Sequence, residues 1–265
     1  MTGNFKVMGV INVTPDSFSD GGLFFQTDNA VKQAHNLIKQ GADIIDIGGE
    51  STRPGAKEVS ADEEISRVIP VIEKLRQTNK SITISIDTSK AEVMAEAIKA
   101  GADFINDVNA LLSPGTLEVA AEYDVPVCLM HKQGMPQTMQ HNPHYQDVVA
   151  EVMSFLDARI EACQKAGICS KNIIIDPGIG FGKTLEHNLA LLKNIKQLKS
   201  LGYPLLIGVS RKTMIGQILD AEVDERIYGS LAIAQFAYMH GADIFRVHDV
   251  KATVDVLTMT KALMD

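Results

Sequence analysis

Residues 41–46 read Gly41-Ala42-Asp43-Ile44-Ile45-Asp46, and the same plan returns at Gly101-Ala102-Asp103-Phe104-Ile105-Asn106 and at Gly241-Ala242-Asp243-Ile244-Phe245-Arg246. Each copy has a glycine suited to ending a helix, a short turn, two apolar residues suited to a strand, and then a polar residue. Such recurrence is typical of a repeated β–α unit. Ordinary helix-to-strand joints would explain the glycine but not the polar residue, so we expect polar side chains to gather at the strand ends.

The remaining strands follow from short apolar runs. In Ile173-Ile174-Ile175-Asp176-Pro177-Gly178, three β-branched residues indicate a buried parallel strand that ends at an acid. Eight strands alternate with at least eight helices, and no linker or charge block divides the chain. The sequence therefore predicts an α/β fold, a single-domain (β/α)8 TIM barrel over residues 1–265, with its chemistry at the carboxyl ends of the strands. The most clearly bounded strands are 6–12, 82–87, 127–130, 205–208 and 244–247.

Composition excludes several classes of protein. The chain has 265 residues, 45% of them hydrophobic, which is enough for a barrel-sized core. A formal net charge of -8 argues against a general nucleic-acid surface. Cys128, Cys163 and Cys169 have neither metal nor disulfide spacing, which suits a reducing compartment. The chain begins without a signal-peptide pattern and has no apolar run near the ~20 residues of a membrane span, so we expect a cytoplasmic protein.

Acidic and amide side chains stand at several predicted strand ends. Asp87, Asn106 and Asp176 could surround a flat heterocycle, because a carboxylate facing an amino-pyrimidine edge accepts two parallel hydrogen bonds. For Asp176 alone, a solvated loop aspartate that caps a turn is the alternative. The full set of polar residues at the strand ends is Asn12, Asp46, Asp87, Asn106, His131, Asp176, Lys212, Arg246 and His248.

The cationic residues suit an anion. Arg246 and His248 share a strand face, so both could reach one phosphate group; a salt bridge to Asp46 or Asp249 is the alternative. The segment Ser210-Arg211-Lys212-Thr213 should open a helix, and Lys212 could pack over a planar ring or be a solvated lysine. Gly208 leaves room for the close approach of a ligand. No Ser–His or Cys–His nucleophilic pair is evident.

Other signals are weaker. Gly182-Lys183-Thr184 resembles the end of a phosphate-binding P-loop, but Pro177 stands where that motif needs its first glycine. His141 and His144 have metal-like spacing without a third ligand nearby, which favours a surface pair. The loops after the first two strands are long for barrel connections and are candidate lids.

Those two loops carry a resemblance to a known family. The segments 11–22 and 46–55, the second reading Asp46-Ile47-Gly48-Gly49-Glu50-Ser51-Thr52-Arg53-Pro54-Gly55, resemble the two signature loops of the dihydropteroate synthases. Further matching segments follow in family order across the chain: 85–88, 105–107, 130–131, 176–183, 210–212 and 246–249.

The resemblance implies condensation of a dihydropterin hydroxymethyl pyrophosphate with para-aminobenzoate, giving dihydropteroate for folate synthesis and releasing pyrophosphate. It also implies a Mg²⁺ cofactor bound through Asn12, a homodimer joined by its last helices, and a sulfonamide target. Pterin would be held by Asp87, Asn106, Asp176 and Lys212, in a pocket shaped by Met130, Phe181 and Gly208. Pyrophosphate would be held by Asn12, Arg246 and His248. Thr52, Arg53, Ser210, Thr213 and Phe181 would lie near the aminobenzoate, and the catalytic set would be Asp87, Asp176, Lys212, Arg246 and His248.

Two other functions remain open at this stage. One is a pterin-binding methyltransferase barrel that passes a methyl group from methyltetrahydrofolate to a cobalamin protein. Such a barrel should lack the 51–55 loop and the Ser210-Arg211-Lys212 start, both present here. The other is a non-catalytic pterin-binding homologue that serves a partner protein, which the intact pyrophosphate and loop residues disfavour.

Overall fold

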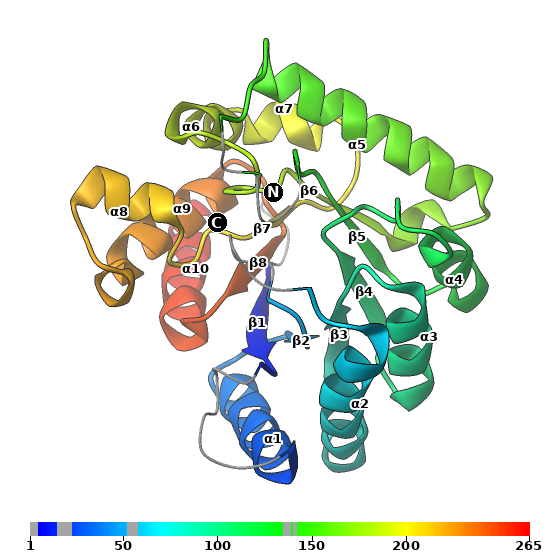
Figure 1. Ribbon diagram of the computed structural model, residues 1–265. Helices are drawn as coiled ribbons and strands as arrows, with labels where there is room; N and C mark the ends of the chain where they lie inside the picture. The colour runs from blue at the N-terminus through cyan, green and yellow to red at the C-terminus, as the bar shows by residue number, and fades with distance from the viewer. Residues whose placement is uncertain (1–4, 15–22, 52–57, 135–138, 140–141) are drawn as a thin grey trace.

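The computed structural model describes residues 5–14, 23–51, 58–134, 139 and 142–265. Parallel strands alternate with helices, and the helices surround the strands (Figure 1). The strands are β1 Lys6–Asn12, β2 Ile44–Gly48, β3 Thr83–Asp87, β4 Phe104–Asp107, β5 Val127–Met130, β6 Ile173–Asp176, β7 Leu206–Ile207 and β8 Ile244–Val247. The helices are α1 Leu23–Lys39, α2 Ala61–Thr78, α3 Ala91–Ala100, α4 Thr116–Tyr123, α5 Val148–Lys165, α6 Leu185–Lys193, α7 Ile195–Lys199, α8 Thr213–Leu219, α9 Ile227–Met239 and α10 Val250–Met264.

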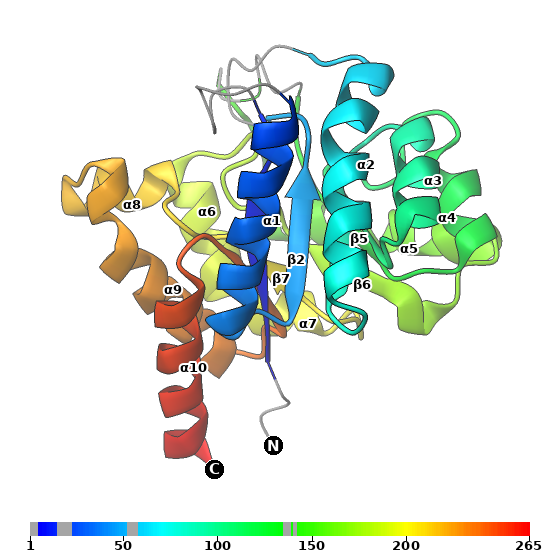
Figure 2. The same ribbon diagram turned by 90° about the horizontal axis from the view of Figure 1, so that it is seen from below.

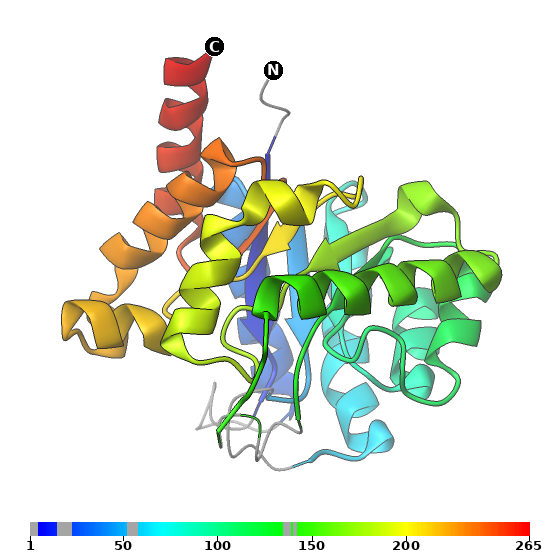
Figure 3. The ribbon, with the colours of Figure 1, turned by 90° about the horizontal axis from the view of Figure 1, so that it is seen from above.

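The eight strands form one sheet that curls into a nearly closed barrel. Their order is β6-β5-β4-β3-β2-β1-β8-β7, and every pairing is parallel. The two edge strands meet through a single parallel bridge between Ile175 and Leu205, where the Ile175 N–H donates to the Pro204 carbonyl at 2.9 Å. Helices α5, α6 and α7 lie on one side of the barrel (Figure 3). The predicted (β/α)8 barrel is confirmed.

The recurring Gly-Ala-Asp plan has a structural explanation at the amino ends of the strands. Each glycine has a positive φ, between 100° and 114°, which ends the preceding helix without a side-chain clash. The aspartate carboxylates then accept backbone N–H groups near the start of a neighbouring strand: Asp43 from Val7, Asp103 from Ile84 and Asp243 from Leu205. The plan therefore ties adjacent strands together as the chain enters the barrel.

The barrel interior has an apolar layer with a polar layer above it. The apolar layer consists of Met8, Ile44, Phe104, Cys128, Ile174, Leu206 and Ile244. Strand residues two positions apart share a face, so the next inward position on several of these strands is polar. It is Asp46 on β2, Asn106 on β4, Asp176 on β6 and Arg246 on β8. We call the carboxyl ends of the eight strands the barrel mouth; in Figure 2 the arrowhead of β2 points toward it and away from the C-terminus.

Two local expectations were wrong. The sequence predicts one helix through Leu189 and Leu198, but Asn194 separates α6 from α7, and its side-chain amide donates to the Ala190 carbonyl at 2.8 Å. The spacing of Ser89 and Glu92 predicts that Ser89 caps α3, but Lys90 stands at the cap position and the Ser89 hydroxyl donates to Asp107 at 2.6 Å. No helix in the described ranges is both long and apolar enough to cross a membrane.

Candidate active site

Arg246 links two acids across the barrel mouth. Its Nε donates to Oδ2 of Asp46 at 2.6 Å and its Nη2 to Oδ2 of Asp87 at 2.5 Å. The salt-bridge alternative therefore holds for Asp46, whereas Asp249 pairs with Arg211 instead. The Nη1 group of Arg246 makes no hydrogen bond to the described part of the chain, so it remains available to an anion. Residues from β2, β3 and β8 thus meet at one point.

Asp46 lies at the centre of this arrangement and is fully buried. It accepts hydrogen bonds from the Ser85 hydroxyl at 2.6 Å, the Asn106 amide at 3.2 Å, and Arg246. These donors compensate the cost of burying a carboxylate. Because the Asn106 NH₂ group points at Asp46, its carbonyl oxygen is left for another donor. Sequence reasoning placed Asp46 at a strand end and gave it no role. Asp46 shares a strand face with Ile44, which was the signal that its side chain points into the barrel.

Asp176, Lys212 and Phe181 form the opposite wall of the mouth. One oxygen of Asp176 accepts the Gly178 N–H at 2.7 Å, so this residue is not a solvated loop aspartate but a buried one, only 5% exposed. The Lys212 ammonium lies 4.3 Å from the centre of the Phe181 ring, so its charge faces an aromatic side chain of the protein itself. Gly208 has open space beside it, since an added Cβ would meet only the Arg246 Cβ, at 4.0 Å.

The charges of these walls act on one another. Burial raises the pKa of Asp87, and the Arg246 guanidinium opposes that rise. Burial also raises the pKa of Asp176, against the Gly178 N–H and the Lys212 charge. For Lys212, burial and then the Arg246 charge lower the pKa to about 8, while Asp176 and Asp87 oppose them. The two predicted pterin acids and both cations therefore share one electrostatic environment.

His248 and Ser210 lie together at the edge of the mouth. The Ser210 oxygen accepts the His248 backbone N–H at 3.2 Å and lies 3.0 Å from its ring Nδ1. This contact between a serine and a histidine was not predicted from the sequence. The serine oxygen is held by the backbone donor, so we assign it a role in orienting the His248 ring. Thr213 begins α8 and is exposed.

His131 does not contribute its side chain to the mouth as its strand-end position suggests. Its ring Nδ1 lies 3.0 Å from the Lys183 ammonium, and both side chains are buried. Burial, and next the Lys183 charge, lower the pKa of His131 to about 3. The preceding residue, Met130, is 4% exposed and also buried. Sequence reasoning missed this contact: Lys183 stood in the failed P-loop comparison and in the matching segment 176–183, and neither pointed to His131.

Asn12 is the predicted metal ligand. It ends β1 opposite Gly48 of β2, is half-buried, and its side chain makes no hydrogen bond to the residues that the structure describes. Among those residues, no group of three or more His, Cys, Asp or Glu could hold a metal. Mg²⁺ commonly takes one or two protein oxygens and completes its shell with phosphate and water. One amide oxygen therefore fits a metal that arrives with a phosphorylated substrate.

The segment before Thr52 and Arg53 is anchored at its base. Both residues, like His141 and most of the two candidate lids, lie outside the described residues. Just before them, Glu50 pairs with Lys90, whose ammonium also donates to the buried Glu64 of α2 at 2.6 Å. This pairing fixes the point from which the second loop leaves the barrel.

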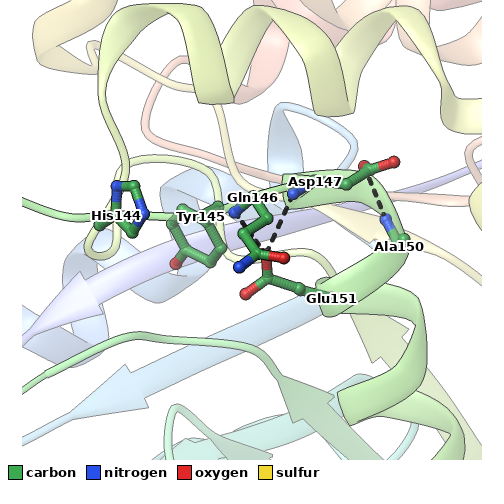
Figure 4. Close-up of a pocket in the computed structure, with 6 residues that line it drawn as sticks. All are labelled: His144, Tyr145, Gln146, Asp147, Ala150 and Glu151. Carbon is green, nitrogen blue, oxygen red and sulfur yellow. Dashed lines mark hydrogen bonds between the residues drawn. The ribbon is translucent and has the colours of Figure 1, made fainter.

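A separate open pocket of about 480 Å³ lies where the chain enters α5 (Figure 4). Its lining residues are His144, Tyr145, Gln146, Asp147, Ala150 and Glu151. Glu151 accepts the backbone N–H groups of Gln146 and Asp147 there. None of the mouth acids or cations lines this pocket, so it is separate from the site described above.

Comparison with known proteins agrees with this geometry. Residues 8–248 match the family model described as pterin binding enzyme. The dihydropteroate synthase of Escherichia coli K12 is 53% identical over 97% of this chain and 91% of that protein. The Yersinia pestis dihydropteroate synthase, solved in a sulfonamide drug complex, superposes with a TM-score of 0.93 at 49% identity, covering 98% of this chain and 94% of that one. The Xanthomonas albilineans enzyme with 4-aminobenzoic acid gives 0.93 and 49%, covering 98% and 93%.

Proposed function

This chain belongs to the dihydropteroate synthases of the pterin-binding enzyme family, and from this premise we propose how its barrel mouth performs their reaction. The chain condenses 6-hydroxymethyl-7,8-dihydropterin pyrophosphate with para-aminobenzoate, giving 7,8-dihydropteroate and pyrophosphate. The observation that best supports the residue roles is the position of Arg246, which contacts Asp87 and shifts the pKa of Lys212. Arg246, which is proposed to bind the departing pyrophosphate, therefore lies beside Asp87 and Lys212, which are proposed to bind the pterin ring.

Pterin recognition belongs to the two walls of the mouth. Asp176 has one oxygen held by Gly178, which leaves the other for the amino-pyrimidine edge of the ring. Asn106 presents its amide oxygen, and Lys212 packs on the ring as it packs on Phe181. Hydrogen bonds to charged partners contribute about 1.5–3 kcal/mol each, so two of them are enough to orient a flat ligand.

Pyrophosphate departure uses the cations. The Nη1 group of Arg246 and the ring of His248 donate to the phosphate oxygens as the bond to the pterin methylene carbon breaks. Mg²⁺ bound through Asn12 would supply Lewis-acid stabilisation of the same anion. Asp87 and Asp176 stabilise the positive charge that remains on the pterin. The substitution is therefore dissociative: the negative charge of pyrophosphate and the positive charge of the pterin are stabilised by different residues of the mouth.

The aminobenzoate needs no strong base. An arylamine is mostly neutral at cellular pH, so its lone pair is ready to attack the methylene carbon that pyrophosphate leaves, and the nitrogen then loses one proton to the released pyrophosphate or to water. The two long loops, including Thr52 and Arg53, close over the mouth and exclude water, with Ser210, Thr213 and Phe181 near the second substrate. Sulfonamides would compete for this position; the Yersinia pestis relative was solved in a sulfonamide drug complex.

The chain also presents exposed apolar residues suited to a homodimer interface. We expect this homodimer to act in the cytoplasm. Its exposed large apolar residues on the last helices are Ile218, Leu219, Tyr228, Phe236, Met239, Met259, Leu263 and Met264. Exposed apolar groups gathered on neighbouring elements are typical of interfaces. Light scattering after size exclusion would give a dimer mass, and a monomer at micromolar concentration would contradict this part of the proposal.

A pyrophosphate-release assay tests the function. Release should require both substrates, fall strongly when Mg²⁺ is chelated, and yield dihydropteroate. Release without para-aminobenzoate would indicate a hydrolase. Methyl transfer from methyltetrahydrofolate to a cobalamin protein, or pterin binding without turnover, would support the two alternative functions instead.

A further inference from the structure

The Lys183 side chain is 3% exposed, yet it ends in an ammonium group. Its Nζ lies 2.9 Å from the Gly178 carbonyl oxygen, 3.0 Å from that of Phe181 and 3.3 Å from that of His131. The His131 ring nitrogen Nδ1 lies a further 3.0 Å away. An ammonium has three donors and no acceptor, so a cage of carbonyl oxygens and a neutral imidazole nitrogen matches it.

This cage joins two segments of the chain. His131 directly follows β5, whereas Gly178 and Phe181 belong to the turn that follows β6. Gly178 and Gly180 have positive φ values of 67° and 85°, so the turn has little intrinsic preference for its shape. The Asn188 side chain accepts the Gly180 N–H at 2.7 Å and the Tyr145 hydroxyl donates to the Gly182 carbonyl at 2.9 Å, and the Lys183 contacts add the link from this turn to the end of β5.

The same turn carries pterin-binding groups. Asp176 stands immediately before it and accepts the Gly178 N–H. The Phe181 ring lies beneath the Lys212 ammonium, and the Phe181 carbonyl is one of the Lys183 acceptors. A shift of this turn would move the Asp176 partner and the Phe181 ring together.

The charge of Lys183 also affects the groups around it. Three ionisable groups face Lys183: His131, Asp176 and Lys212. The Lys183 charge favours the ionised form of Asp176, which burial disfavours. His131 stays neutral at ordinary pH, because burial and the Lys183 charge lower its pKa to about 3, so its ring nitrogen can accept.

We propose that Lys183 is a positioning residue for pterin binding: its buried side chain clamps the turn after β6 to the end of β5 and thereby holds Asp176 and Phe181 in place for the ring. The inference rests on the proposed function, since it assumes that the ring binds between Asp176 and Phe181. Lys183 itself touches no substrate in this scheme.

The test replaces Lys183 with methionine, which keeps a long unbranched side chain but removes the terminal ammonium and its donors. Lys199→Met is the matched control, because the Lys199 ammonium also binds a carbonyl, that of Tyr203 at 2.9 Å, and a carboxylate, that of Asp243 at 2.6 Å, at the amino end of the barrel. We expect Lys183→Met to raise the calorimetric Kd for a dihydropterin at least about tenfold, the size expected for one lost charge-assisted contact. The control should bind as the wild type does.

Steady-state kinetics separate positioning from general damage. The KM for the pterin pyrophosphate should rise in Lys183→Met. The KM for para-aminobenzoate should rise less, because Phe181 is the one residue proposed near that substrate that lies on the clamped turn. A folded Lys183→Met variant with wild-type pterin Kd would overturn the inference. Should that variant not fold, Lys183→Gln is the substitute: its side chain is one methylene shorter, has no charge and brings a carbonyl oxygen toward the three carbonyl oxygens of the cage, so the clamp is weakened and a wild-type Kd would count equally against the proposal. If the proposed function itself is wrong, the wild-type chain will not bind a dihydropterin or will not release pyrophosphate, which distinguishes that failure from failure of the Lys183 inference.

Discussion

Arg246 of β8 and Asp46 of β2 meet inside the barrel over the intervening strand β1, with 2.6 Å between Nε and Oδ2. The carboxylate is fully buried and the guanidinium is 24% exposed at its side chain, so the pair spans the boundary between the interior and the mouth. One end of the arginine is held by buried acids while Nη1 is left for a ligand. A flexible cation is thereby oriented before any anion arrives, which lowers the entropic cost of binding.

Asp46→Asn tests this orienting role. The change removes one charge beneath Arg246 and replaces an acceptor of the Asn106 amide, so pterin affinity and turnover should both fall. Loss of charged hydrogen bonds should cost about 1–3 kcal/mol of stability. Urea unfolding and calorimetry measure the two effects. Asp43→Asn is the control, since Asp43 is exposed on the turn before β2 and an asparagine can still accept the Val7 N–H; equal losses in both variants would contradict the role.

Asp176→Asn should abolish measurable pterin binding. The carboxylate has one oxygen for the Gly178 N–H and one for the amino-pyrimidine edge of the pterin. Asparagine replaces one of these oxygens with an NH₂ group, so at one of the two contacts two hydrogen-bond donors face each other. Calorimetry with a dihydropterin measures it. Asp103→Asn makes the same chemical change at the amino end of β4 and should leave affinity intact. Unchanged affinity in Asp176→Asn would refute the assignment.

Much of this fold could be predicted from sequence because its signals are local. The Gly-Ala-Asp copies mark where helices end and strands begin, and the two-residue alternation placed Asp46, Asn106 and Arg246 on the inner face. What could not be predicted depends on distances between strands. Arg246 selects Asp46 and Asp87 rather than Asp249 because β8 adjoins β1 and the side chain reaches across the interior.

The same limit explains the misassigned residues. His131 has a strand-end position like its neighbours, but its ring pairs with Lys183, which is 52 positions away in the chain. No periodicity reports such a contact. Ser210 and His248 come together across 38 positions for the same reason. Local patterns therefore identified which residues reach the mouth more reliably than which partners they find there.

Arg53→Ala should spare pterin binding and reduce turnover. Its loop leaves the barrel after β2, where Glu50 is paired with Lys90, and is proposed to act on the second substrate. The KM for para-aminobenzoate should rise while the pterin Kd is unchanged. A variant that lost pterin affinity alone would show that Arg53 serves the first substrate instead.

Gly178→Ala should damage the turn after β6 severely. A Cβ there would lie 1.8 Å from the His131 carbonyl oxygen, at a φ of 67°, so the backbone must move and the Asp176 contact must be lost. We expect pterin binding to disappear together with several kcal/mol of stability, about the cost of overpacking plus strain. Gly202→Ala is the matched control: its φ is 87°, but nothing lies within 4 Å of the added Cβ. A small stability loss with normal binding is expected there, and similar behaviour of both variants would contradict the close approach of the two segments.

The stability of the wild type relative to Lys183→Met should rise with pH above neutrality. Burial lowers the pKa of Lys183 from 10.5 to about 7, so between these values the unfolded chain binds a proton that the folded chain has released. Unfolding then takes up protons, and the free energy of unfolding increases with pH by at most about 1.4 kcal/mol per unit from this one group. Methionine cannot titrate, so the difference in unfolding free energy between the two proteins should grow from about pH 7 to pH 9 in urea titrations. A constant difference across that range would show that Lys183 remains charged in the folded protein, and that its carbonyl cage fully compensates its burial.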